Sequence, residues 1–90
     1  MGTRKRPSVR KRPSPRRLPK KLALVRKRLG LSQGDMVTAL KLGERYTRAS
    51  ISGYERGERE PPLPVLLAYA RLGGVSMEVL VDDKMTLPNK

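Results

Sequence analysis

Residues 47–57 carry two kinds of side chain at helical spacing. Ile51 and Tyr54 lie three positions apart and predict the buried side of a short helix, which Thr47 would cap and Gly57 would end. The opposite side carries small, polar or basic residues: Arg48, Ala49, Ser52 and, at its edge, Gly53. Such a side suits contact with another surface, although a helix that only faces solvent could have the same composition.

The outward side chains have chemistry that fits the edges of base pairs. The guanidinium of Arg48 could bind a guanine bidentately, the methyl of Ala49 could meet a thymine methyl, and the hydroxyl of Ser52 could donate or accept. Residues at the start of a helix in the major groove reach the base edges first. We therefore expect base contacts from these residues, while Thr47 could both cap the helix and touch a phosphate.

A second capped helix precedes this one. Ser32 and Asp35 form an N-terminal capping pair, and Gly43 is expected to end the helix. Its inward side is apolar: Met36, Val37 and Leu40. Gln33, in the first turn, could bind a phosphate beside the free amides of the helix start, and Arg56 could do the same or only complement the dipole of its own helix. Two short capped helices in tandem indicate a DNA-reading unit.

Glu55 follows Tyr54 on a helix whose apolar neighbours pack inward, so its carboxylate is expected to be partly buried. A buried carboxylate needs a cation, and Arg26 on the preceding apolar stripe is the candidate partner. We expect an ion pair that ties these two helices together. The alternative is a surface glutamate near the basic N-terminal segment.

Composition narrows the function further. Ninety residues permit one domain, with a small aliphatic core because Phe and Trp are absent. The chain also lacks His and Cys, which removes the common general bases, nucleophiles and transition-metal ligands. We therefore expect no enzymatic activity, no metal and no cofactor. The lack of Cys suits a reducing cytoplasm, and no apolar run approaches the length of a membrane span.

Positive charge is concentrated at the N-terminus of a chain whose net charge is +13. The first 17 residues hold eight basic side chains and no acid: Arg4, Lys5, Arg6, Arg10, Lys11, Arg12, Arg16 and Arg17. Because this segment has three prolines and little apolar surface, we expect residues 1–17 to be a disordered basic arm. The arm could enter the minor groove, attract phosphates without specificity, or remain a solvated tail.

The remaining sequence predicts helices over residues 19–29, 64–72 and 76–81, beside the two capped helices already described. Five helices over residues 18–83 predict an all-α bundle, with residues 84–90 as a short exposed tail. A short strand over residues 79–81 is the alternative at the end of the domain, since two of its three residues are β-branched.

Several of these features occur together, in order, in one known family. They are Arg26, Leu31-Ser32-Gln33, Ile51-Ser52-Gly53-Tyr54-Glu55-Arg56-Gly57, Pro61 and Leu66-Leu67-Ala68-Tyr69-Ala70. Residues 22–75 thereby resemble the Cro and phage-repressor helix-turn-helix family, of the xenobiotic-response-element type. The resemblance implies a lambda-repressor-like domain that binds duplex DNA sequence-specifically, usually as a dimer on a two-fold site. It also implies the Arg26–Glu55 pair, the phosphate role of Gln33, and base contacts from Arg48, Ala49 and position 53.

Three features depart from the family pattern. Residues 41–44 lengthen the connection between the two capped helices. Gly53 stands where a long base-reading side chain is common, and Val37 replaces a small residue at a close helix contact. A change in the connection or at the helix contact would alter how the reading helix is presented.

The sequence thus favours a bacterial or phage-type transcriptional regulator, acting as a repressor by occupying its site through residues 48–56. A homodimer surface is expected on the last helix: Val79, Leu80 and Val81. One alternative is an antitoxin that binds a partner toxin protein and regulates its own gene. Another is nonspecific nucleic-acid binding driven by the arm.

Overall fold

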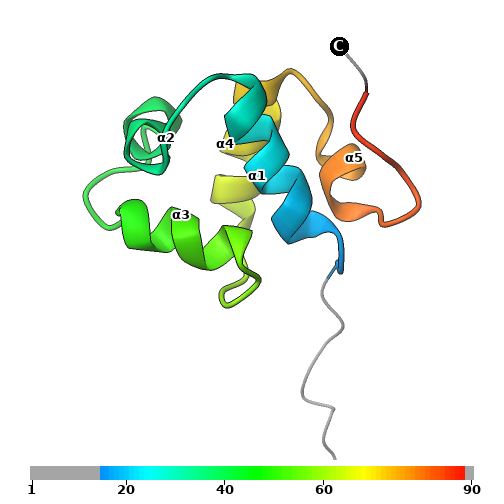
Figure 1. Ribbon diagram of the computed structural model, residues 1–90, viewed down its shortest axis with the longest axis horizontal. Helices are drawn as coiled ribbons and strands as arrows, with labels where there is room; N and C mark the ends of the chain where they lie inside the picture. The colour runs from blue at the N-terminus through cyan, green and yellow to red at the C-terminus, as the bar shows by residue number, and fades with distance from the viewer. Residues whose placement is uncertain (1–14, 89–90) are drawn as a thin grey trace, which may run out of the picture.

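The computed structural model describes residues 15–88, and this part of the chain folds into helices without strands (Figure 1). The helices are α1 (Leu18–Arg28), α2 (Gln33–Leu40), α3 (Arg48–Glu55), α4 (Leu63–Gly73) and α5 (Met77–Val81). The all-α expectation is therefore confirmed over these residues. The alternative of a strand at residues 79–81 is wrong, because they form the last helix.

Short polar residues start two of the helices as the sequence indicated. Asp35 N–H donates to Ser32 Oγ at 3.0 Å, and Ser32 N–H donates to the Asp35 carboxylate at 3.4 Å, which closes the capping pair of α2. Val79 N–H donates to Ser76 Oγ at 3.1 Å at the start of α5. These bonds satisfy backbone donors that have no partner within the helix.

The end of α2 differs from the expectation. Gly43 was expected to end the helix, but the last helical residue is Leu40 and Lys41 adopts a left-handed conformation with φ of 55°. Gly43 lies in the connection that follows, where its carbonyl accepts the Tyr46 N–H at 3.3 Å. A left-handed lysine is uncommon because its Cβ crowds the backbone, so the packing of the connection must offset the strain.

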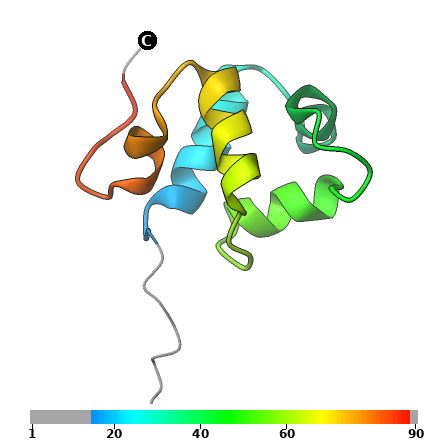
Figure 2. The ribbon, with the colours of Figure 1, turned by 180° about the vertical axis from the view of Figure 1, so that it is seen from behind.

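Helices α1 and α4 cross at the centre of the molecule, with α2 and α3 on one side and α5 on the other (Figure 2). The largest fully buried side chains come from all five helices: Tyr69, Leu22, Met36, Ile51, Leu80 and Val65. One small core therefore fixes α3 relative to the rest of the domain, as an interaction surface on a small protein requires.

The two ends of the described chain are tied together. The backbone N–H groups of Arg16 and Arg17, just before α1, donate to the Asp83 carboxylate at 2.9 and 3.0 Å. On the next turn the buried Lys21 Nζ donates to the carbonyls of Val79 and Asp82 at 2.7 and 2.9 Å. The C-terminal segment thereby holds the root of the basic arm.

Two expected boundaries change as a result. Residues 84–90 were expected to be an exposed tail, but Leu87 is buried in the core and residues 84–88 pack back along α1. Arg16 and Arg17 were expected to belong to the arm, yet the Asp83 contacts tie them to the folded domain. Residues 1–14, with the other six basic side chains of the arm, lie outside the described residues.

The expected dimer surface on α5 is also reduced. Leu80 is 0% exposed in the core of its own chain, so it has no surface to offer a second copy. Val79 is half-buried, and of the three residues only Val81 is exposed. Among the described residues, no helix is long and apolar enough to cross a membrane.

Candidate nucleic-acid interface

The first turn of α3 is open to solvent at the edge of the molecule (Figure 1). Thr47 is the N-cap residue, and its N–H donates to Ser50 Oγ at 3.1 Å. Thr47, Arg48 and Ala49 are exposed, and Ser52, one turn further on, is half-buried. A helix start with exposed small and basic side chains can approach another surface closely.

The opposite side of α3 anchors it to the core. Ile51 is 0% exposed and Tyr54 is 4% exposed, so the prediction that these two side chains point inward is confirmed. Ser50 is also buried, where its hydroxyl accepts the cap hydrogen bond. Burial of these side chains fixes which residues of α3 remain outside.

An ion pair joins α1 to α3. Arg26 Nε donates to one carboxylate oxygen of Glu55 at 2.7 Å, and its Nη2 donates to the other at 3.0 Å. The side chains are only 14% and 7% exposed, so this bidentate pair is largely withdrawn from solvent. Arg26 Nη1 also donates to the Leu31 carbonyl at 2.9 Å, in the turn before α2. The hydrogen bonds with Glu55 raise the pKa of Arg26, and its guanidinium stays charged.

Gln33 belongs to the same network. Its Nε2 donates to Glu55 at 3.2 Å, so the amide at the start of α2 is held against α3. The amide nitrogen carries two hydrogens, and Glu55 occupies one of them. The network therefore links the first three helices while leaving Gln33 a donor at the helix start.

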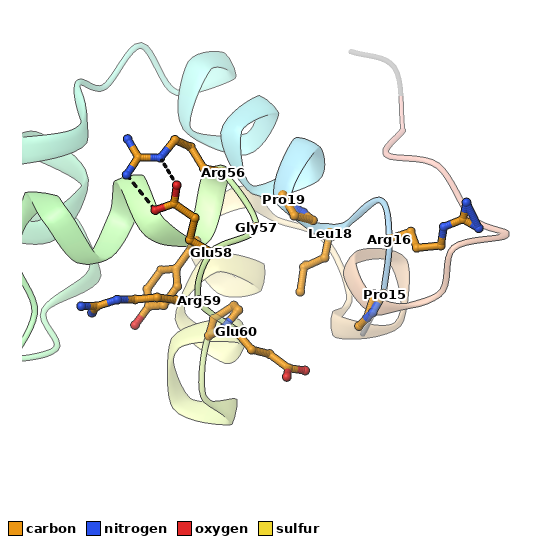
Figure 3. A pocket seen from close by; sticks show the side chains of 11 residues that line it. Pro15, Arg16, Leu18, Pro19, Arg56, Gly57, Glu58, Arg59 and Glu60 are labelled. Carbon is orange, nitrogen blue, oxygen red and sulfur yellow. Dashed lines mark hydrogen bonds and ion pairs between the residues drawn. The ribbon is translucent and has the colours of Figure 1, made fainter. Parts of the chain in front are cut away.

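Arg56 is paired on the molecular surface. Its Nε and Nη2 donate to the Glu58 carboxylate at 3.1 and 2.9 Å, and the side chains are 62% and 61% exposed (Figure 3). These hydrogen bonds raise the pKa of Arg56 and lower the pKa of Glu58. An approaching phosphate would have to share Arg56 with this carboxylate.

Gly53 was expected to be exposed at the edge of the outward side of α3, but it is covered. It is buried, because the stem of Arg59 crosses the place where a side chain would begin. A Cβ built on Gly53 would lie 3.0 Å from Arg59 Cδ and 3.1 Å from Cγ. The N–H groups of Glu58 and Arg59 both donate to the Gly53 carbonyl, at 2.9 and 3.2 Å. No residue pattern predicts that a loop residue would cover this position.

The lengthened connection between α2 and α3 is packed rather than extended into solvent. Leu42 and Tyr46 are partly buried against the core. The Gly43–Tyr46 hydrogen bond closes a turn between them. Two apolar anchors in seven residues hold this connection down, so the start of α3 stays accessible.

The root of the arm lies close to the end of α3. Pro15 and Arg16 line a groove of about 560 Å³ together with Pro19 and residues 56–61 (Figure 3). Arg17, in contrast, is engaged within the domain, since its Nη1 donates to the Asp83 carbonyl at 2.8 Å. Pro15 and Arg16 thus lie beside the segment that follows α3.

A capped helix, a packed turn and a second helix with an exposed first turn define a helix-turn-helix protein. A family model described as Helix-turn-helix matches residues 22–80. The chain belongs to this family, of the Cro/C1 type, which supports a function in DNA binding of the transcription-regulator kind. No curated protein matches the sequence.

Proposed function

We propose that the protein binds a specific duplex DNA sequence through α3 and acts as a transcriptional repressor by occupying its site. The exposed first turn of α3 carries the proposal, because Arg48 and Ala49 stand clear of the core while Ile51 and Tyr54 anchor the helix behind them. A helix presented in this way can enter the major groove with its N-terminal residues against the base edges.

Base recognition is assigned to Arg48, Ala49 and Ser52, and phosphate contacts to Gln33, Thr47 and Arg56. Gln33 keeps one amide hydrogen beyond the bond to Glu55, and it lies at a helix start where backbone donors favour an anion. The Arg56–Glu58 pair is exposed, so a phosphate can compete for the guanidinium. Phosphate contacts from Thr47 and Arg56, at the two ends of α3, would hold this helix in register with the base pairs.

The arm adds attraction along the DNA backbone. Six of its eight basic residues precede Pro15, and Pro15 lines the groove beside the end of α3. From that point a basic segment could follow phosphates or enter the adjacent minor groove. Action on DNA implies that the protein works in the cytoplasm of a bacterium or phage host.

Selection of bound duplexes from a random pool tests this proposal. The chain, an Arg48→Ala variant and a variant with the six N-terminal arm cations replaced by Gln are compared at one salt concentration. We expect one enriched motif for the parent, a relaxed motif for Arg48→Ala, and the same motif at lower affinity for the arm variant. Binding without any sequence preference, unchanged by Arg48→Ala and lost in the arm variant, would instead support nonspecific binding.

The repressor assignment and the partner are tested separately. With the enriched motif placed in a promoter, transcription in vitro should fall when the protein is added, and a rise would contradict repression. A two-fold motif with half-sites about 34 Å apart would support a dimer. On α5, Val81 with the half-buried Val79 remains the candidate dimer contact. Co-purification of one stoichiometric small protein that blocks DNA binding would favour the antitoxin alternative.

A further inference from the structure

We propose that Arg59, which reaches across Gly53 from the loop after α3, reads a base pair in place of the side chain that Gly53 lacks. This proposal rests on the proposed function, since it concerns how the same helix would recognise DNA. It assigns a specificity role to a loop residue outside the reading helix.

The first support is the position of the Arg59 stem. Gly53 lies one helical turn after Ala49, so the two share one side of α3. Arg59 Cγ, Cδ and Nε lie 3.1, 3.0 and 3.5 Å from the point where a Cβ of Gly53 would be. The guanidinium is therefore carried along the side of α3 that also bears Ala49.

The second support is the anchoring of the loop. Both Glu58 and Arg59 donate their backbone N–H groups to the Gly53 carbonyl, which fixes the start of the Arg59 side chain relative to α3. A long side chain that starts from a fixed backbone and lies along a helix loses less freedom on binding than one on a mobile loop. The arrangement is organised before DNA arrives.

The third support is the charge around the guanidinium. Glu58, the adjacent acid, is bonded to Arg56, and Glu60 extends in the opposite direction from Arg59 (Figure 3). Among the described residues, the Arg59 guanidinium makes no hydrogen bond or salt bridge, and the residue is exposed. A planar guanidinium with open donors matches the two acceptors that guanine presents in the major groove.

Gly53 explains why the loop residue can occupy this place. A Cβ at position 53 would already lie 3.0 Å from Arg59 Cδ and 3.1 Å from Cγ, so the stem would have to move. Gly also weakens the interior of a helix, and a gain in recognition would offset that weakness. The glycine and the arginine therefore act as one unit.

The test compares the parent with Arg59→Ala, Arg59→Lys and Gly53→Ala on a panel of single-base variants of the selected site. Arg71→Ala, which removes an exposed cation on α4, is the matched control. We expect Arg59→Ala to lose discrimination of about 5- to 150-fold at one base pair, while preferences elsewhere stay unchanged. Arg59→Lys should lose most of it, because the bidentate fork is gone. Gly53→Ala should reduce discrimination at the same base pair, although this substitution leaves the charge of the protein unaltered.

Other results would overturn the proposal. A uniform loss of affinity across the panel, with a smaller salt dependence, would make Arg59 a phosphate contact. Unchanged discrimination in Arg59→Ala, alongside relaxed specificity in Arg48→Ala, would reject this role while preserving the proposed function. If the parent itself selects no motif, the proposed function fails first. Because Arg59 is exposed, substitutions at this position leave the packing of the core intact. Thermal unfolding checks that the Gly53→Ala variant is folded.

Discussion

Breaking the Arg26–Glu55 pair is expected to destabilise the whole domain. In Arg26→Ala, the Glu55 carboxylate would lose two hydrogen bonds, at 2.7 and 3.0 Å, and keep only the bond from Gln33 at 3.2 Å. Its side chain is 7% exposed, so water cannot replace the missing guanidinium without a rearrangement. Removing one partner of a buried pair costs about 3–5 kcal/mol, a large share of the roughly 5–15 kcal/mol that stabilises a small domain.

Urea unfolding followed by circular dichroism measures the loss in the free energy of unfolding. Thermal unfolding gives a second readout: at about 4–8 °C per kcal/mol for a domain of this size, the melting temperature should fall by roughly 12 °C or more. The matched control is Arg56→Ala, which breaks the exposed pair with Glu58 and should unfold close to the parent. An Arg26→Ala variant as stable as the parent would refute the reasoning, because it would mean that solvent reaches Glu55.

The double variant Arg26→Met with Glu55→Leu separates pairing from burial. Replacing both charges by apolar side chains of similar size leaves no unpaired buried carboxylate, and such exchanges are often neutral. We expect the double variant to be more stable than the sum of the single changes predicts. Strictly additive losses would show that the two side chains act independently.

Other variants test the packing and the chain ends. Gly73→Ala would place a Cβ 2.9 Å from Val25 Cγ1 and should cost about 1–3 kcal/mol in unfolding free energy, despite the better helix propensity of alanine. Gly34→Ala, whose Cβ would meet nothing closer than 3.8 Å, should instead gain up to about 1 kcal/mol, and equal effects of the two would contradict the packing argument. The backbone hydrogen bonds from Arg17 and Arg16 hold the pKa of Asp83 below its usual range, so their stabilisation is present at neutral pH and disappears as pH falls through that lowered pKa. Asp83→Asn should therefore be less stable than the parent near pH 7, with the difference shrinking as pH falls through the lowered pKa of Asp83, and a difference independent of pH would disprove the role of the charge.

Local signals in the sequence predicted much of the fold. The capping serines Ser32 and Ser76 act within four residues, so their helices begin where they were expected. The inward side of α3 followed from the spacing of Ile51 and Tyr54. Such features depend on residues close together along the chain, so residue type and spacing are enough to predict them.

Features that depend on distant contacts were missed. Lys41 ends α2 although nothing in its residue type indicates a left-handed conformation. Leu87 joins the core, and Asp83 binds the backbone just before α1, because the C-terminal segment folds back on residues more than 60 positions earlier. The cover that Arg59 places over Gly53 depends on the loop geometry after α3. The residue type at one position does not predict contacts of this kind between distant segments.

The same division holds for the interface. Arg48 and Ala49 could be chosen from residue type and helical position, and both are exposed. The hydrogen bond from Gln33 to Glu55 depends on how α2 and α3 pack, whereas the pairing of Arg56 with Glu58 joins residues only two positions apart. Base and phosphate contacts remain predictions for all of these residues.

Contact between the first turn of α3 and the base edges is the central proposal for this protein. Nuclear magnetic resonance of the full chain bound to a selected duplex measures this through nuclear Overhauser effects between protein and base protons. We predict such effects from the Ala49 methyl to a thymine methyl or another major-groove proton, with the largest amide shifts at the starts of α2 and α3. Contacts confined to α4 or α5, with an unperturbed α3, would contradict the account.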